Sequence, residues 1–182
     1  VAVTPVGEEI VARAKDVLAM VETMEETAKA HSDPLAGVLR LGMIPTIGPY
    51  LTPCLLPSLR HELPSLELQL SENMTPVLER QLADGEVDAV IIATPISDPH
   101  FEEIALYSEP FWVAVPHGHS MEAREDIDVT DIELGDLLLL ADGHCLRDQV
   151  LSFCNAGHRG DAVPNTQHTS FPTILALVGA GM

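Results

Sequence analysis

Apolar residues recur every three or four positions along the first stretch of the chain, between Thr4 and His31. They are Ile10, Ala14, Val17, Val21 and Met24, and this spacing predicts one long amphipathic helix. Thr4-Pro5 is expected to supply its N-cap and first residue, and Ser32-Asp33-Pro34 to end it. The apolar stripe suits packing against a second copy of the helix or against the helix's own domain.

Short apolar runs and amphipathic segments alternate along the rest of the chain. We expect strands at Val38–Ile44, Leu66–Leu70, Asp88–Ala93, Phe111–Pro116 and Leu137–Leu140, and helices at Pro49–Glu62, Thr75–Asp84, Cys145–Cys154 and Ser170–Gly179. Strands interleaved with helices predict a parallel, doubly wound α/β sheet. In such sheets ligands bind beyond the carboxyl ends of the strands, which is where Thr46 and Thr75 are expected. Capping a loop or helix is the alternative role for both threonines.

The composition sets outer bounds on what the chain does. Its 182 residues are 46% hydrophobic, enough for a sizeable core in one or two domains. The formal charge of -19 argues against this part gripping nucleic acid, because phosphate binding needs patches of Lys and Arg. We see no apolar run of membrane-spanning length and no basic, apolar leader, so neither a membrane span nor a secretion signal is expected.

The segment DGHCLRDQ (residues 142–149) places the Cys145 thiol between His144 and Arg147, directly after an Asp-Gly turn. The thiolate is the reactive form of cysteine, and neighbouring cations or a helix N-terminus favour it. A sulfenic acid formed on such a cysteine condenses with a nearby thiol to give a disulfide, and Cys154 follows nine positions later. The segment is therefore typical of a redox switch, with two unrelated buried cysteines as the alternative.

The spacing of the two cysteines adds a structural condition. The apolar residues after the turn predict a short helix from Cys145 to Cys154. Nine helical residues rise about 13 Å and turn the second side chain to the opposite face, whereas a disulfide needs Cα atoms roughly 4.4–6.8 Å apart. The two thiols can bond only if the helix unwinds or the segment refolds, so oxidation would exchange one local structure for another.

The run DGHCLRDQ, with FC after it, resembles the sensing segment of OxyR-type hydrogen-peroxide sensors, which are LysR-type transcription regulators. Further similarity lies in GVLRLGMIPTIGPYLTPCLLPSL (37–59), LERQLADGEVDAVIIA (78–93) and VTPVGEEIVARAKDVL (3–18). The resemblance therefore covers nearly the whole chain. The cysteine motif is highly specific, while the LADGEVDAVI type of segment is shared by LysR-type regulators generally.

The resemblance implies an α/β, two-lobed, periplasmic-binding-protein-like sensor domain preceded by a long linker helix. Residues 1–33 would form the linker and dimerisation helix, 38–110 the first part of regulatory subdomain I, and 111–182 a truncated subdomain II. The chain is then incomplete at both ends. The implied partners of the parent protein are DNA, bound through a winged helix-turn-helix outside this chain, a homodimer or tetramer, and RNA polymerase. The implied location is the cytoplasm, with hydrogen peroxide as the signal, no membrane and no cofactor.

The same resemblance assigns roles to the residues of the motif. Cys145 matches the peroxide-reactive cysteine and would attack the O–O bond, while Cys154 matches the cysteine that closes the disulfide. His144 and Arg147 would supply positive charge or hydrogen bonds to the thiolate and the departing hydroxide. Thr46, in the matching IPTIGPY segment, would position peroxide or a bridging water.

The remaining candidates carry weaker signals. Thr75 is a further peroxide-site residue, in the less distinctive segment SENMTPVLE, and Asp148 is expected to cap the helix or to pair with Arg147. Cys54 follows Pro53 in an apolar run and is expected to be a packed core thiol. The eight histidines lack the spacing of a zinc site, so no metal is expected.

Three functions remain open at this stage. The first is a peroxide-sensing regulatory domain switched by a Cys145–Cys154 disulfide, which is not a turnover enzyme. The second is a LysR-type domain that binds a small organic effector without thiol chemistry. The third is a thiol-dependent peroxidase acting as an enzyme. Pairing both cysteines with the GHCLRD motif favours the first.

Overall fold

The computed structural model describes residues 3–30, 35–96, 98–155, 167–168 and 170–182. They form two compact units, residues 1–91 and 92–182, and each unit is described by itself. This division precedes the boundary expected at residue 110, because residues 92–110 group with the second unit. The expected subdomain boundaries therefore stay predictions for the complete sensor domain.

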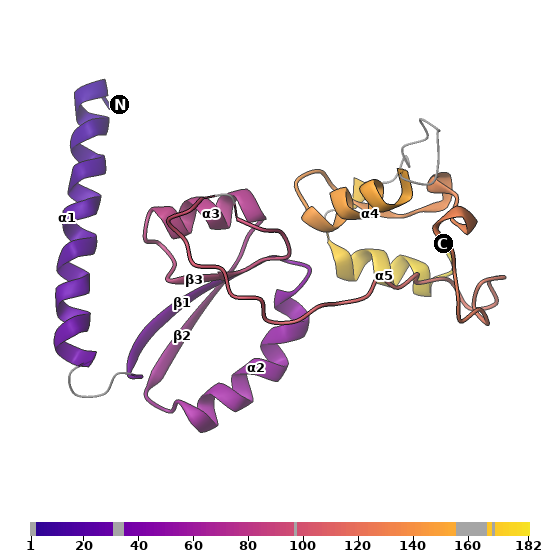
Figure 1. Cartoon of the computed structure of the whole chain (residues 1–182), viewed down its shortest axis with the longest axis horizontal. Coiled ribbons are helices and arrows are strands. Elements are labelled where there is room, and N and C mark those ends of the chain that lie inside the picture. Colours follow the sequence, from indigo (N-terminus) through magenta and orange to yellow (C-terminus); the bar gives the residue numbers. More distant parts are fainter. Residues whose placement is uncertain (1–2, 31–34, 97, 156–166, 169) are drawn as a thin grey trace. The chain divides into compact units, whose positions relative to one another are not determined.

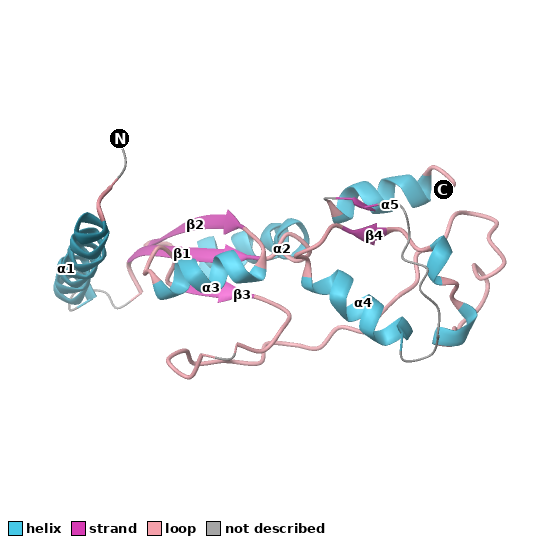
Figure 2. Cartoon of the chain, turned by 90° about the horizontal axis from the view of Figure 1, so that it is seen from above, coloured by secondary structure: helices cyan, strands magenta, loops and turns pink. Residues whose placement is uncertain are grey.

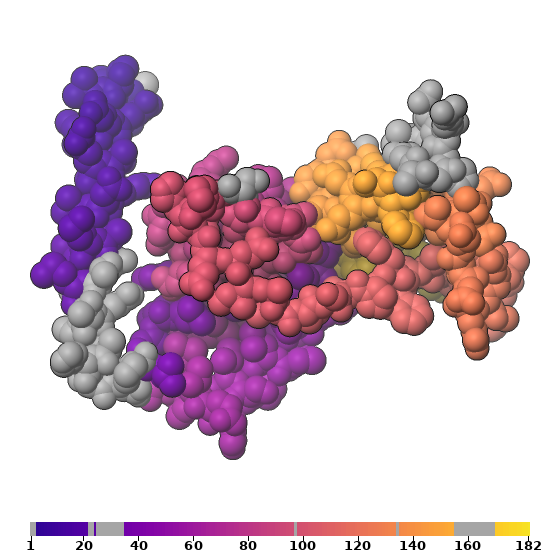
Figure 3. Space-filling model, in the orientation of Figure 1, coloured from indigo at the N-terminus to yellow at the C-terminus, as the bar shows by residue number. Residues whose placement is uncertain are grey.

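The first unit begins with the long helix α1 (Pro5–Ala30), as the apolar spacing predicts. Thr4 caps it, because the Thr4 hydroxyl oxygen accepts a hydrogen bond of 3.2 Å from the Gly7 amide. α1 is one continuous helix (Figure 1), drawn as a space-filling surface in the same orientation in Figure 3. The apolar side chains of Ile10, Val17 and Met24 on this helix are more than half exposed. The predicted end at Ser32-Asp33-Pro34 lies outside the described residues.

Three parallel strands form the sheet of the first unit, in the order β2-β1-β3. They are β1 (Gly37–Met43), β2 (Leu66–Glu72) and β3 (Ala89–Ile91), with Leu41 of β1 paired with Leu70 and Ala89 of its neighbours. The connecting helices α2 (Gly48–Glu62) and α3 (Thr75–Ala83) lie on opposite sides of the sheet (Figure 1). This confirms the predicted parallel α/β architecture.

The core of the first unit is built around the central strand β1 and the helix α3. Met43 and Leu78 are almost completely buried, and Leu41, Ile44 and Val87 are also buried. Gly42 lets α3 approach the strand closely, since a Cβ at this position would lie 2.6 Å from Cδ2 of Leu78. This packing holds the carboxyl end of β1 against the start of α3, next to the two candidate threonines.

Among its described residues, the second unit has two short parallel strands, two α-helices and two 3-10 helices (Figure 2). Two 3-10 helices, η1 (Val129–Asp131) and η2 (Leu134–Asp136), precede β4 (Leu139–Leu140) and α4 (Cys145–Asn155), and β5 (Gln167–His168) precedes α5 (Phe171–Gly179). Leu139, Leu140, Cys154 and Ile174 are buried.

One expected strand of this unit is wrong. The apolar residues of Phe111–Pro116 form no strand, although their hydrophobicity suits one. A strand requires a hydrogen-bonded neighbour, and within the described residues this segment pairs with no other strand. Phe111 and Trp112 are more than half exposed. The strand β5 was not predicted, because two residues carry no readable alternation.

Candidate redox site

The cysteine motif lies between a short strand and a helix. β4 ends at Leu140, a turn follows, and Gly143 in that turn has a φ of 94°, which residues with a Cβ rarely adopt. The carbonyl of His144 accepts a hydrogen bond of 3.0 Å from the Arg147 amide, and α4 begins at Cys145. Cys145 is therefore the first residue of a helix, where unpaired backbone N–H groups favour negative charge.

Both cysteines of the motif lie on α4, as the sequence predicts. Cys145 is half-buried and Cys154 is buried, and neither forms a disulfide. Nine helical residues separate their Cα atoms by about 13 Å along the axis and place the side chains on opposite sides. A disulfide between them is incompatible with this helix, since it requires Cα atoms roughly 4.4–6.8 Å apart.

The environments of the two thiols differ. Burial raises the pKa of the Cys154 thiol, so this cysteine stays protonated in the helical form. Cys145, the first residue of the helix, is only half-buried and is therefore the more accessible of the two cysteines. The arrangement suits Cys145 as the cysteine that attacks peroxide and Cys154 as the cysteine that later closes the disulfide.

Arg147 is buried, although it carries a charge. Its Nη1 donates a hydrogen bond of 3.1 Å to the carbonyl oxygen of Leu140, and its Nε lies 2.9 Å from a carboxylate oxygen of Asp142. The guanidinium therefore ties the first turn of α4 to the end of β4. Asp142 lies in the same motif, but its position before a glycine indicates only a turn, so its contact with Arg147 cannot be read from the sequence.

The other two motif residues have distinct surroundings. His144 is buried, and its Nε2 has no hydrogen-bond partner in the described part of the chain. Asp148 is exposed in the first turn of α4, where a carboxylate stabilises the helix end. Asp148 was expected to cap the helix or to pair with Arg147; the Nε of Arg147 pairs with Asp142 instead, and the capping role of Asp148 stays a prediction.

The candidate threonines belong to the first unit. Thr46 is half-buried in the turn after β1, and Thr75 is the first residue of α3. Neither makes a side-chain capping bond: Ile47 and Met74 occupy the two N-cap positions. The Thr75 hydroxyl is buried without a hydrogen-bond partner among the described residues, which leaves it able to bind a ligand. That Thr46 and Thr75 share a peroxide site with Cys145 stays a prediction.

The expected burial of Cys54 is wrong. Cys54 lies on α2 and is exposed, while its neighbour Leu55 is half-buried. Apolar neighbours in the sequence do not decide which side of a helix a residue occupies. Cys54 is thus more exposed to reagents than Cys145, which is half-buried, or Cys154, which is buried.

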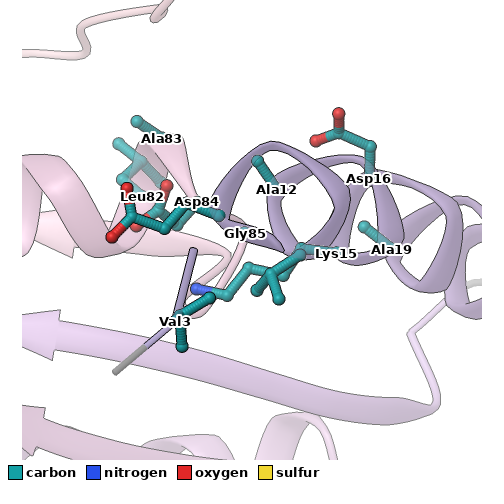
Figure 4. A pocket seen from close by; sticks show the side chains of 11 residues that line it. Val3, Ala12, Lys15, Asp16, Ala19, Leu82, Ala83, Asp84 and Gly85 are labelled. Carbon is teal, nitrogen blue, oxygen red and sulfur yellow. The ribbon is translucent and has the colours of Figure 1, made fainter. Parts of the chain in front are cut away.

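Other surfaces of the described residues offer less chemistry. No group of three His, Cys, Asp or Glu side chains could hold a metal ion within the ranges given above. A groove between α1 and the end of α3 is lined mainly by small and apolar side chains, with Lys15 and two aspartates at its edges (Figure 4). Among the helices that the structure describes, none has the length and apolarity to cross a membrane.

Comparison with known proteins identifies the family. Residues 32–182 match the LysR substrate binding domain. The chain belongs to the LysR family. It is 37% identical over 180 residues to a probable hydrogen peroxide-inducible genes activator from Mycobacterium leprae, covering 99% of this chain and 58% of the relative. It is 38% identical over 179 residues to the DNA-binding transcriptional dual regulator OxyR of Escherichia coli K12, covering 98% of this chain and 58% of the relative.

Solved structures of LysR-family regulators give the same result. A full-length OxyR variant from Pseudomonas aeruginosa is 41% identical with a TM-score of 0.76, covering 96% of this chain and 60% of that one. A hydrogen-peroxide-bound OxyR mutant from Corynebacterium glutamicum is 37% identical with a TM-score of 0.77, and the match covers 96% of this chain and 55% of that one. The α/β fold is that of OxyR regulatory domains, and the chain spans about 58% of the length of the curated LysR-family relatives.

Proposed function

We propose that this chain is the redox-sensing part of a LysR-type transcription regulator, switched by peroxide oxidation of Cys145 to a disulfide with Cys154. One observation carries the proposal: an accessible thiol at a helix N-terminus shares that helix with a buried, protonated thiol. The similarity to hydrogen peroxide-inducible activators over nearly the whole chain supports it.

The chemistry proceeds in two steps. The Cys145 thiolate attacks one peroxide oxygen, the O–O bond breaks, hydroxide leaves, and Cys145 becomes a sulfenic acid. The Cys154 sulfur then attacks the Cys145 sulfur, an S–S bond forms, and the sulfenic oxygen leaves as water with the thiol proton. Two thiols lose two electrons in total, and one peroxide is reduced to two waters. Restoring the dithiol requires an external thiol reductant.

His144 and the two threonines are assigned supporting roles in this proposal. The free Nε2 of buried His144 and the unpartnered hydroxyl of buried Thr75 are polar atoms with capacity to bind peroxide or the leaving hydroxide. Thr46 would position the peroxide or a bridging water. Asp148 would favour the helical form of α4 by its place in the first turn.

Two other functions make different predictions. An organic effector domain would respond normally after Cys145→Ser, because its ligand would not need the thiol. A peroxidase would turn over continuously with a reductant, whereas a sensor needs one oxidation for each activation. The presence of both thiols on one helix favours the sensor.

The parent protein is proposed to act in the cytoplasm as a homodimer or tetramer that binds DNA and contacts RNA polymerase. The exposed apolar side chains of α1 suit pairing with a second copy of the helix. Sedimentation of the full-length protein carrying Val17→Glu tests this: the oligomer should weaken, and an unchanged oligomer would exclude α1 from the interface.

Cysteine variants of the full-length protein test the switch. After stoichiometric peroxide in the presence of dimedone, Cys154→Ser should accumulate one dimedone adduct on Cys145, because the sulfenic acid has no partner thiol. Cys145→Ser should gain no adduct and no disulfide, and Cys54→Ser should behave as the unmodified protein does. Equal oxidation of Cys145→Ser and the unmodified protein would reject the proposal.

A further inference from the structure

Arg147 is held by two acceptors that both precede α4 in the sequence. The Leu140 carbonyl and the Asp142 carboxylate bind Nη1 and Nε at 3.1 and 2.9 Å. The arginine side chain is 8% exposed and the Asp142 side chain 81% exposed. An exposed carboxylate therefore neutralises a buried cation. Water screens the Asp142 charge, so Asp142 can be changed with less disturbance of the packing than Arg147.

Arg147 lies on the same side of α4 as Cys154 rather than on the side of Cys145. Residues seven apart on a helix share a face, and residues two apart do not. The burial of both Arg147 and Cys154 agrees with this, while Cys145 is only half-buried. The contacts of Arg147 thus belong to the helical, reduced arrangement of the segment.

The geometry points to Asp142 as a positioning residue of the redox couple, acting through Arg147. This inference rests on the proposed function. Disulfide closure requires residues 145–154 to leave the helix, and Arg147 lies within that ring, so its contacts to Leu140 and Asp142 are lost as the S–S bond forms. The Asp142–Arg147 ion pair therefore stabilises the dithiol and raises the reduction potential of the couple.

The effect is measured by redox titration of the full-length protein with glutathione. The couple reacts as Cys145–SH plus Cys154–SH plus oxidised glutathione, giving the protein disulfide plus two reduced glutathiones. Asp142→Asn keeps the size and turn preference of the side chain but removes its charge. We expect the equilibrium constant to move about three- to tenfold towards the disulfide. The reduction potential of the Cys145–Cys154 couple would then be roughly 15 to 30 mV more negative.

Three controls separate this role from a general loss of structure. Asp136→Asn removes the same charge from an exposed side chain of the same unit and should leave the potential unchanged. Asp142→Glu keeps the charge and should recover at least half of the shift. In an Arg147→Gln background, Asp142→Asn should cause no further shift, because its partner is gone.

The outcomes distinguish this inference from the proposed function. If the unmodified protein forms no Cys145–Cys154 disulfide in any glutathione buffer, the proposed function fails. If it forms the disulfide, but Asp142→Asn has the potential of Asp136→Asn, the role of Asp142 is wrong. A shift that persists in the Arg147→Gln background would also overturn it.

Discussion

At the scale of single residues, one glycine decides how closely α3 packs on β1. A Cβ at Gly42 would lie 2.6 Å from Cδ2 of Leu78, whose side chain is completely buried and cannot move aside freely. We expect Gly42→Ala to lower the free energy of unfolding by about 1–3 kcal/mol in urea denaturation. Gly135→Ala is the matched control, because a Cβ there meets nothing within 4 Å. Equal stability of the two variants would contradict this packing.

The sequence predicted some residues of the site better than others. The motif was readable because a thiol between His144 and Arg147 is chemically distinctive. Asp142 was missed as a partner because its chemistry depends on where the Arg147 side chain goes, and local sequence does not fix that direction. Cys54 was wrongly placed in the core for a similar reason: hydrophobic neighbours do not define the buried side of α2.

At the scale of elements, local patterns predicted the helices well. The Thr4 cap and the beginnings of α3 and α5 agree with the structure to within a residue, since caps and apolar periodicity are properties of neighbouring residues. The strand predicted at Phe111–Pro116 failed because a strand depends on a partner distant in sequence. Long-range pairing is the part of the fold that a single sequence specifies least directly.

The element that the proposed switch depends on is α4. Arg147 holds the first turn of this helix through its hydrogen bond to the Leu140 carbonyl. Gln149 donates a hydrogen bond of 3.0 Å to the Ala93 carbonyl, and the ring of Phe153 stacks on that of Phe111 with 5.6 Å between the ring centroids. Because the disulfide is incompatible with the helix, oxidation should increase amide hydrogen exchange across residues 145–154 in the full-length protein. Exchange in α5 should change much less. Identical protection of α4 in the reduced and oxidised protein would contradict the switching mechanism, even if a disulfide formed.

At the scale of the whole molecule, the proposal places redox sensing in this chain and DNA binding outside it. The proposed function assigns DNA binding to a winged helix-turn-helix outside this chain, and the formal charge of -19 of this chain agrees with that assignment because phosphate binding needs patches of Lys and Arg. The chain spans about 58% of the length of the curated LysR-family relatives from Mycobacterium leprae and Escherichia coli K12. In the proposed function, a redox signal at α4 would therefore act through a change in shape or assembly rather than by direct contact with the operator.

The most direct measurement is intact-mass analysis with peptide mapping of the full-length protein after brief exposure to stoichiometric hydrogen peroxide. The account predicts the loss of two hydrogens, located in one disulfide between Cys145 and Cys154, with Cys54 still free. Cys54 is a built-in control, since it is the more exposed thiol and lacks a partner on its own helix. No change in mass at stoichiometric peroxide, or a disulfide that includes Cys54, would contradict the central claim.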